Sequence, residues 1–188
     1  MEEKILVTGC AGFIGFHVSK KLLNKGLFVV GLDNINDYYD VRLKKARLKE
    51  LKKFSKNNSK GKFFFVKEDL KNKNTLKNIS KQHLPKKVIH LAAQSGVRHS
   101  IENPSEYINS NLVGFGNVLE FCKDNQVEHL IYASSSSIYG GNKKVPFSEK
   151  DFVEYPVSLY AATKRSNELM AHSYSHLFKL PCTGIRLF

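Results

Sequence analysis

The segment Lys4-Ile-Leu-Val-Thr8-Gly-Cys-Ala-Gly12-Phe-Ile-Gly15 decides the fold. It begins with a short, mostly apolar run that contains β-branched residues, which predicts a buried strand at residues 4–8. Three glycines then follow at a spacing of three residues. Residues 16–25 have helical periodicity, which Gly26 ends. Residues 27–32 predict a second strand, and Asp33 follows it directly.

This order of strand, glycine loop, helix, strand and acid is that of a dinucleotide-binding unit. Gly9, Gly12 and Gly15 let the backbone turn tightly and approach a pyrophosphate, which then lies at the positive end of the helix. Asp33 is placed to accept hydrogen bonds from an adenosine ribose, and its charge disfavours a 2′-phosphate. We therefore expect NAD rather than NADP. The alternative is a loop that merely needs glycines.

Strands and helices continue to alternate along the rest of the chain. Further strands are predicted at residues 62–68, 87–91, 127–133 and 182–188. Helices are predicted at residues 41–54, 75–81, 104–124 and 157–178, with a loop at residues 96–103. The length of 188 residues is that of one domain. We therefore expect a single dinucleotide-binding domain over residues 1–188, with an α/β fold and a doubly wound parallel sheet.

A tyrosine and a lysine lie four residues apart in the helix predicted at residues 157–178. The side chains of Tyr160 and Lys164 should leave the same face of that helix. A neighbouring ammonium favours the phenolate, so this pair can make the tyrosine a base near neutral pH. A second Tyr-x-x-x-Lys match starts at Tyr139, but its two glycines argue against a helix there.

Ligands of a parallel sheet bind at the carboxyl ends of its strands. The residues at these ends are polar, small or glycine-rich, so they predict one crevice: residues 9–15, 33–34, 69–70, 91–95 and 134–137. The last of these segments is a run of four serines, for which a purely structural turn is the alternative.

A serine, a tyrosine and a lysine together suit hydride transfer from a secondary alcohol. The tyrosine would take the hydroxyl proton while hydride leaves for a nicotinamide ring. The lysine would lower the tyrosine pKa and hold the nicotinamide ribose, and the serine would orient the substrate oxygen. Hydrolysis by a Ser-His-Asp triad is disfavoured, because the sequence contains no Gly-x-Ser-x-Gly elbow.

The formal net charge is +13, and the cations are concentrated in residues 42–87, which hold 17 Lys or Arg and 3 Asp or Glu. Without interleaved aromatic residues or a recognition motif, this region is interpreted as a solvated basic face rather than a nucleic-acid site. Apolar runs are too short to span a membrane, and the N-terminus lacks a signal-peptide pattern. Three widely spaced cysteines predict a reducing cytoplasm and no metal site.

Four segments resemble nucleotide-sugar epimerases and dehydratases of the extended short-chain dehydrogenase/reductase superfamily. They are Gly9-Cys-Ala-Gly12-Phe-Ile-Gly15, His90-Leu-Ala-Ala93, Ala133-Ser-Ser-Ser-Ser-Ile-Tyr-Gly140 and Tyr160-Ala-Ala-Thr-Lys164. Within this family, four further segments are similar to UDP-glucuronate 4-epimerases: Asp33-Asn-Ile-Asn-Asp-Tyr-Tyr-Asp-Val-Arg-Leu-Lys44, Gln94-Ser-Gly-Val-Arg98, Ser100-Ile-Glu-Asn-Pro104 and Asn111-Leu-Val-Gly114. Ser136 and Ser137 stand where a 4,6-dehydratase is expected to carry an acid/base pair, which favours an epimerase.

The resemblance implies a Rossmann-like fold that holds NAD and a separate C-terminal sugar-binding lobe, which is largely absent from this sequence. It implies a NAD-dependent 4-epimerase that converts UDP-glucuronate into UDP-galacturonate through a 4-keto intermediate. The alternatives are a truncated NAD-binding module without turnover and a different nucleotide-sugar epimerase or dehydratase. The resemblance also implies a homodimer, because superfamily members commonly pair through two helices, one of which bears the tyrosine.

The resemblance further assigns residues by position. The expected catalytic residues are Ser135, Tyr160 and Lys164. The expected cofactor-binding residues are Gly9, Gly12, Phe13, Ile14, Gly15, Asp33, Asn34, Asn36, Asp69, Leu70, Leu91, Ala92, Ala93, Ser95, Ser110, Tyr160 and Lys164. The expected substrate-binding residues are Arg98, Ser134, Ser135 and Ser136. At Arg98 an ordinary surface arginine is the alternative.

Overall fold

Six parallel strands form one sheet in the order β3-β2-β1-β4-β5-β6 in the computed structural model, which describes residues 3–57 and 61–188. The strands are β1 (Lys4–Thr8), β2 (Phe28–Asp33), β3 (Lys62–Lys67), β4 (Lys87–His90), β5 (His129–Ser135) and β6 (Cys182–Leu187). The strand order reverses between β1 and β4, and ligands of such sheets bind at this switch point. The expected doubly wound parallel sheet is confirmed.

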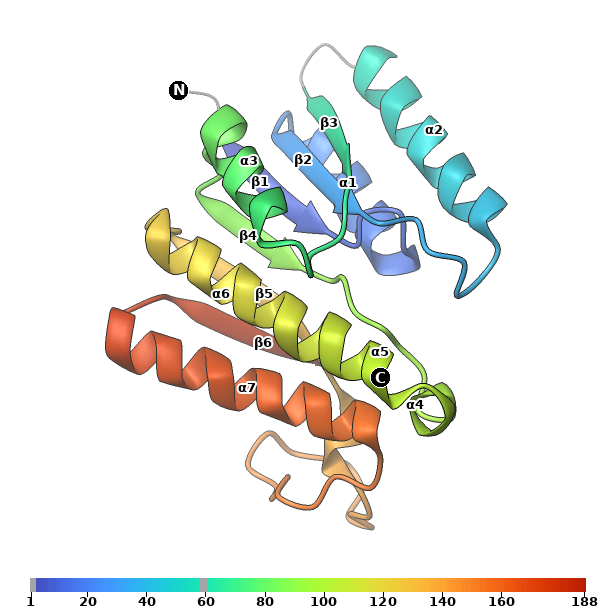
Figure 1. Cartoon of the computed structure of the whole chain (residues 1–188), viewed down its shortest axis with the longest axis vertical. Coiled ribbons are helices and arrows are strands. Elements are labelled where there is room, and N and C mark those ends of the chain that lie inside the picture. The colour runs from blue at the N-terminus through green and yellow to red at the C-terminus, as the bar shows by residue number, and fades with distance from the viewer. Residues whose placement is uncertain (1–2, 58–60) are drawn as a thin grey trace.

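Five main helices cover the sheet (Figure 1). One face carries α1 (Phe13–Asn24) and α2 (Val41–Asn57), and the other carries α3 (Lys73–His83), α6 (Gly114–Asp124) and α7 (Leu159–Phe178). The shorter helical segments are α4 (His99–Glu102), α5 (Pro104–Tyr107), the π-helix η1 (Ile108–Val113) and the 3-10 helix η2 (Ser136–Tyr139). Each face of the sheet thus has its own apolar layer.

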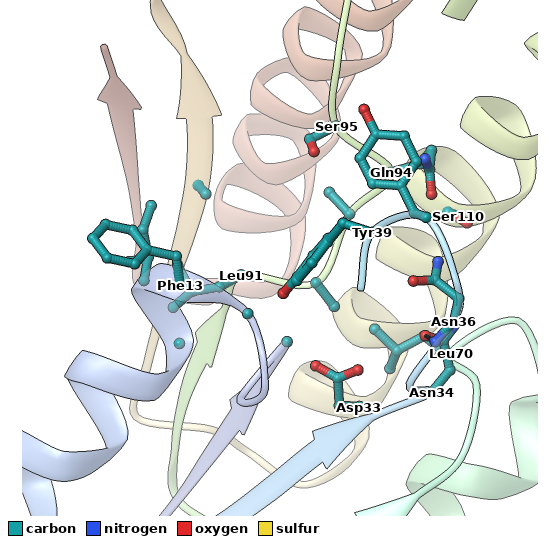
Figure 2. Close-up of a pocket in the computed structure, with 18 of the residues that line it drawn as sticks. Phe13, Asp33, Asn34, Asn36, Tyr39, Leu70, Leu91, Gln94, Ser95 and Ser110 are labelled. Atoms are coloured by element: carbon teal, nitrogen blue, oxygen red, sulfur yellow. Dashed lines mark hydrogen bonds between the residues drawn. The ribbon is translucent and has the colours of Figure 1, made fainter. Parts of the chain in front are cut away.

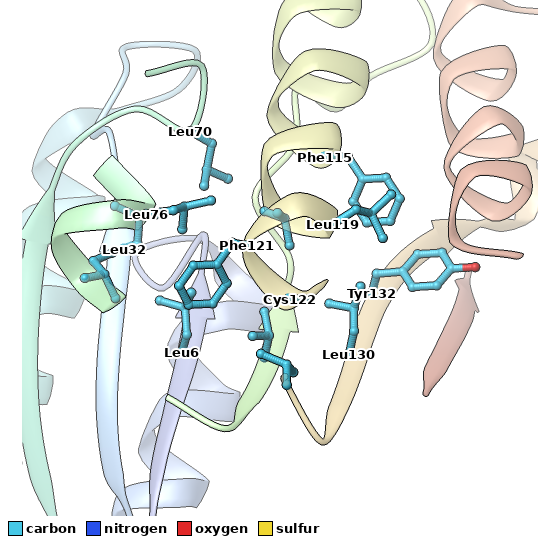
Figure 3. Packing of buried hydrophobic residues seen from close by; sticks show 14 of the residues in the cluster. Leu6, Leu32, Leu70, Leu76, Phe115, Leu119, Phe121, Cys122, Leu130 and Tyr132 are labelled. Atoms are coloured by element: carbon cyan, nitrogen blue, oxygen red, sulfur yellow. The ribbon is translucent and has the colours of Figure 1, made fainter. Parts of the chain in front are cut away.

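The larger apolar cluster lies between the sheet and the helices α3, α6 and α7 (Figure 3). Leu6 of β1 and Leu130 of β5, together with Phe115 and Leu119 of α6, are fully buried in it. Phe115 packs its ring 5.3 Å from that of Tyr132 on β5. The α6 side chains fill the space over β1, β4 and β5, so this cluster anchors the strands whose ends form the crevice.

The second apolar cluster lies under α1 and α2 and stops short of one edge of the sheet. Among the described residues it takes members from β1 to β4 but none from β5 or β6. Burial along β5 alternates accordingly, with Leu130 and Tyr132 buried and Ile131 only half-buried. On β6, Ile185 shares the face of Ile131 and is 44% exposed. The face of β5 and β6 opposite α6 and α7 is therefore open.

Several boundaries differ from the sequence-based expectation. Helix α1 begins at Phe13, three residues early, because the Phe16 amide already donates to the Gly12 carbonyl oxygen at 3.0 Å. Strand β5 extends through Ser135, so the first two serines of the run are strand residues. The helix expected over residues 104–124 is divided by the π-helix η1, and the loop expected at residues 96–103 contains α4.

No helix in the described part of the chain is long and apolar enough to cross a membrane.

Replacing Phe115 with alanine should lower the free energy of unfolding by about 3–5 kcal/mol, because the surrounding cluster cannot close the cavity. The matched control is Phe152→Ala, since Phe152 is 84% exposed, and it should change stability by less than about 0.5 kcal/mol. Urea unfolding of both variants measures the difference. Similar losses in the two variants would contradict the placement of Phe115 in the main core.

Candidate functional site

A cavity of about 650 Å³ opens at the carboxyl ends of the strands. Twenty of the residues expected from the sequence to bind cofactor or substrate, or to act in catalysis, line it: Gly9, Gly12, Phe13, Ile14, Gly15, Asp33, Asn34, Asn36, Asp69, Leu70, Leu91, Ala92, Ala93, Ser95, Ser110, Ser134, Ser135, Ser136, Tyr160 and Lys164. Arg98 lies apart from them, exposed at the N-terminus of α4. The structure thus brings the crevice together and leaves Arg98 outside it.

The glycine loop forms a tight cradle at one wall of this cavity. Gly9 has φ of +71°, and a Cβ there would lie 2.7 Å from the Ala92 nitrogen. A Cβ on Gly15 would lie 2.0 Å from the Gly9 carbonyl oxygen. Helix α1 has no side-chain cap and no acid in its first turn, so its free amides can meet an anion. The loop therefore fits a dinucleotide pyrophosphate.

Asp33 marks the end of the cavity suited to an adenosine ribose. Its Oδ2 accepts a hydrogen bond from the Ala11 amide at 3.0 Å, and its Oδ1 accepts one from the Ile35 amide at 2.9 Å. Each carboxylate oxygen keeps a second acceptor site for a ribose hydroxyl. Beside it the Asn34 side-chain amide donates to Asp69 Oδ2 at 3.1 Å. Figure 2 shows Asp33, Asn34 and Asn36 together across the cavity from Phe13.

Several lining residues were not identified from the sequence, among them Tyr38, Tyr39, Lys44 and Arg47, which follow Asp33 in the chain. The two cations belong to the region interpreted as a solvated basic face, yet Lys44 is only 4% exposed. They share the helix face that carries Leu48 and Leu51, both buried. This helical spacing is the sequence signal that could have distinguished Lys44 and Arg47 from the exposed lysines of α2.

Helix α7 places Tyr160 and Lys164 at the opposite end of the cavity. Ser158 caps this helix by accepting from the Ala161 amide at 3.1 Å, so both residues fall in its first turns. The Lys164 ammonium donates to the Ala133 carbonyl oxygen of β5 at 3.0 Å. Ser135 Oγ accepts from the Ser137 amide at 3.2 Å. The expected trio therefore converges on one corner, where β5 meets α7.

Burial controls the acid–base properties of this corner. It raises the pKa of Tyr160, and the Ser135 hydroxyl opposes this shift only in part. The sequence pattern had predicted a lowered value, but the Lys164 ammonium is engaged with a β5 carbonyl rather than with the phenol. Burial also lowers the pKa of Lys164 to about 8, from an ordinary value of 10.5.

Ser134 takes part in an ion-pair cluster that the sequence analysis did not identify. Its hydroxyl donates to Glu168 Oε1 at 2.7 Å. Arg186 of β6 donates to both oxygens of the same carboxylate at 3.0 Å, and Arg165 donates to one of them. Burial works to raise the pKa of Glu168, but these bonds outweigh it and lower the value. The Ser134 hydroxyl therefore ties β5 to β6 and α7.

A second buried contact joins the ends of β1 and β4. The Thr8 hydroxyl oxygen accepts from the Leu91 and Ala92 amides, each at 3.2 Å, and lies 2.8 Å from His90 Nδ1. Burial, and after it the charge of Lys164, lowers the pKa of His90 to about 3. The imidazole is therefore neutral near pH 7.

Within the described ranges, no group of three His, Cys, Asp or Glu side chains could hold a metal ion.

Replacing Lys164 with methionine should stabilise the cofactor-free chain at pH 7 by about 1–3 kcal/mol, since a buried charge is removed. The folded chain binds fewer protons at Lys164 than the unfolded chain between pH about 8 and 10.5, so the stability of the natural chain rises through that window. The advantage of Lys164→Met should therefore shrink by pH 9.5 in denaturant titrations. Lys45→Met, at an exposed site, is the control. An advantage independent of pH would contradict the lowered pKa.

Comparisons with known proteins agree with this geometry. Protein CapI of Staphylococcus aureus is 54% identical over 98% of this chain and 53% of its own length. The probable UDP-glucuronate 4-epimerase of Rhizobium meliloti is 50% identical over 98% of this chain and 52% of its own length. The crystal structure of the Bacillus cereus UDP-glucuronic acid 4-epimerase, in complex with UDP-glucuronic acid and NAD, superposes with a TM-score of 0.84 at 35% identity. That match covers 97% of this chain and 55% of the solved one.

The chain spans about half the length of the curated relatives it matches. The family model described as GDP-mannose 4,6 dehydratase matches residues 6–188. The chain belongs to the NAD-dependent epimerase/dehydratase family of extended short-chain dehydrogenases/reductases and is homologous to UDP-glucuronate 4-epimerases.

Proposed function

We propose that this chain is the cofactor-binding half of a NAD-dependent 4-epimerase that converts UDP-glucuronate into UDP-galacturonate. One observation carries the proposal: a single cavity joins the glycine loop and Asp33 at one end to Ser135, Tyr160 and Lys164 at the other. Bound NAD would accept hydride from C4 of the sugar and return it to the opposite face of a 4-keto intermediate. The protein's part is to orient the sugar and to move one proton.

The arrangement of Ser135, Tyr160 and Lys164 supports this proposal, because these three side chains can take up and release a proton beside the sugar. Ser135 Oγ accepts from both the amide and the hydroxyl of Ser137, so its own proton is free for donation. That proton can orient the C4 oxygen of a sugar or favour the phenolate of Tyr160. Tyr160 is the general base in this proposal, and Lys164, whose pKa is about 8, supplies a nearby cation that can change its protonation state near neutral pH.

The distribution of carboxylates favours an epimerase over a dehydratase. In the described part of the chain, the carboxylates that line the cavity are Asp33, Glu68 and Asp69, all at the adenosine end. Ser136 and Ser137 follow Ser135 in the short helix η2. Water elimination needs an acid and a base beside the sugar, and among the described residues no carboxylate that lines the cavity belongs to β5, η2 or α7. We propose UDP-glucuronate as the substrate because the names of similar proteins specify it.

A homodimer belongs to the same proposal. Helices α6 and α7 lie side by side on one face of the sheet (Figure 1). Along α7, Leu169 is 52% exposed and Leu177 is 66% exposed. A second copy packed on these helices would cover apolar side chains that water now contacts.

Replacing Gly15 with alanine tests the NAD site. The added Cβ would lie 2.0 Å from the Gly9 carbonyl oxygen, so the loop must shift, at a cost of about 1–3 kcal/mol in stability. NAD affinity, measured by calorimetry, should fall strongly. Gly141→Ala is the control, because a Cβ there would meet nothing within 4 Å, and it should bind NAD as the natural chain does. Unchanged affinity in Gly15→Ala would contradict the pyrophosphate role of the loop.

Activity is best tested in a chimera in which residues 1–188 replace the matching half of a UDP-glucuronate 4-epimerase relative. The chimera should form UDP-galacturonate, and Tyr160→Phe should slow it by about 10²–10⁴-fold, as expected for loss of a general base, while NAD stays bound. Tyr174→Phe is the control on the same helix, since Tyr174 donates to Glu120 and does not line the cavity.

Two outcomes would overturn the assignment. An inactive chimera that nevertheless binds NAD would favour the alternative, a binding module without turnover. A fully active Tyr160→Phe chimera would remove Tyr160 from the role of base.

A further inference from the structure

The carboxyl end of β5 projects beyond β4, its neighbour in the sheet. The last pair between β4 and β5 is His90 with Tyr132, so residues 133–135 of β5 pair only with β6 among the described strands. This projecting end carries Ser135 and the carbonyl that accepts from Lys164. A segment paired on a single side needs further contacts to hold a catalytic hydroxyl in place.

A carboxylate of α7 supplies such a contact. Tyr160, Lys164 and Glu168 are spaced four residues apart, so their side chains leave α7 on one face. Glu168 Oε1 accepts from the Ser134 hydroxyl at 2.7 Å. Ser134 is the Cα partner of Arg186 across the β5–β6 ladder, and Arg186 donates to the same carboxylate. From α7, which packs along both strands (Figure 1), Glu168 therefore holds β5 and β6 near their carboxyl ends.

The contacts of Glu168 leave its carboxylate no chemical role of its own. Oε1 accepts from Ser134 and from Arg186 Nε. Oε2 accepts from Arg165 Nη1 and from Arg186 Nη2, each at 3.0 Å. Each oxygen thus already has two donors, which use its two lone pairs. Glu168 also lies outside the lining of the cavity. It can therefore act on the reaction only through the side chains that it holds.

Strand geometry links the contact at Ser134 to Ser135. Successive side chains of a strand point to opposite faces of the sheet, and the buried residues of β5 are Leu130, Tyr132 and Ser134. The hydrogen bond to Glu168 keeps Ser134 on the face of α7, so it also determines the side on which the Ser135 hydroxyl emerges. Because α7 carries Tyr160 as well, this bond places Ser135 relative to the expected base.

We propose that Glu168 is a positioning residue for the catalytic corner: through Ser134 and Arg186 it fixes the projecting end of β5, and with it the Ser135 hydroxyl, against Tyr160. The proposal rests on the proposed epimerase function. An ion pair that only stabilised the fold would leave the reaction of each folded molecule unchanged. Positioning affects the rate itself, because a displacement of about 1 Å from the productive geometry can slow a reaction by about 10²-fold.

The test uses the chimera described above, with each rate expressed per molecule of bound NAD so that unfolded protein does not count. Glu168→Ala should lower kcat by about tenfold or more. NAD affinity and the KM for UDP-glucuronate should change much less, since the contact serves the transition state rather than binding. The limb of the kcat profile that reports ionisation of the base should move to higher pH, because a displaced Ser135 hydroxyl no longer favours the phenolate of Tyr160.

Glu120→Ala is the matched control. Glu120 is a carboxylate of α6 that also accepts from an α7 side chain, that of Tyr174, and it does not line the cavity. Its removal changes the net charge by the same amount and should leave kcat and the pH profile unchanged. The comparison therefore separates an effect on the corner from a general loosening of α7.

Ser134→Ala removes the link between Glu168 and β5 alone. If Glu168 acts through Ser134, the double variant should be little slower than Glu168→Ala, because both changes remove the same contact. Additive losses in kcat would overturn the proposal. A Ser134→Ala variant with a raised KM and an unchanged kcat would also overturn it, since Ser134 would then contact the sugar itself.

The remaining outcomes separate this proposal from the one it rests on. If the unsubstituted chimera is inactive, the proposed function fails and the positioning role falls with it. If the chimera is active, and Glu168→Ala melts at a lower temperature but keeps its kcat and its pH profile, the positioning role alone is overturned. If Glu168→Ala does not fold, Ser134→Ala decides: a lower kcat at unchanged KM supports the proposal, and an unchanged kcat refutes it.

Discussion

The close approach of two backbone segments at the ends of β1 and β4 is the constraint on which the rest of the site depends. A side chain at Gly9 would lie 2.7 Å from the Ala92 nitrogen, so the glycine loop and the β4 end can meet only because this Cβ is missing. The Thr8 hydroxyl secures the contact by accepting from the Leu91 and Ala92 amides. The glycine loop and the end of β4 form two walls of the cavity. Their positions are therefore determined by backbone geometry, which few substitutions can change.

The two ends of the cavity differ in the hydrogen bonds and the burial of their charged side chains. At the adenosine end, Asp33, Lys44 and Arg47 are held by hydrogen bonds to the backbone of the same loops. At the other end, Lys164 is almost fully buried and its ammonium donates to a carbonyl of β5. The first arrangement places side chains of both signs on one wall of the cavity. The second weakens the charged form, so that protonation can change near neutral pH.

The sequence predicted the parallel sheet and the strand-end segments of the cavity from local patterns, and the family resemblance added residues such as Asn36 and Ser110. Strand ends and glycine spacing are visible residue by residue, and parallel strands bring their ends to one edge. Contacts between distant segments could not be foreseen. Glu168 is joined to Arg186, 18 residues away, only because α7 packs beside β6. Asn111 lies in a π-helix where its side chain bonds the backbone of Gln94, and apolar periodicity does not reveal such a turn.

The contact between Thr8 and His90 also indicates the order in which parts of the structure fold. These residues are 82 positions apart, and parallel pairing across such a separation forms late and slowly. The pairing of β1 with β2, by contrast, closes over a much shorter stretch of chain. An emerging polypeptide therefore carries the complete glycine loop well before it carries the wall on which that loop packs. The capacity to hold a ligand in this cavity then marks the completion of folding rather than the formation of its first unit.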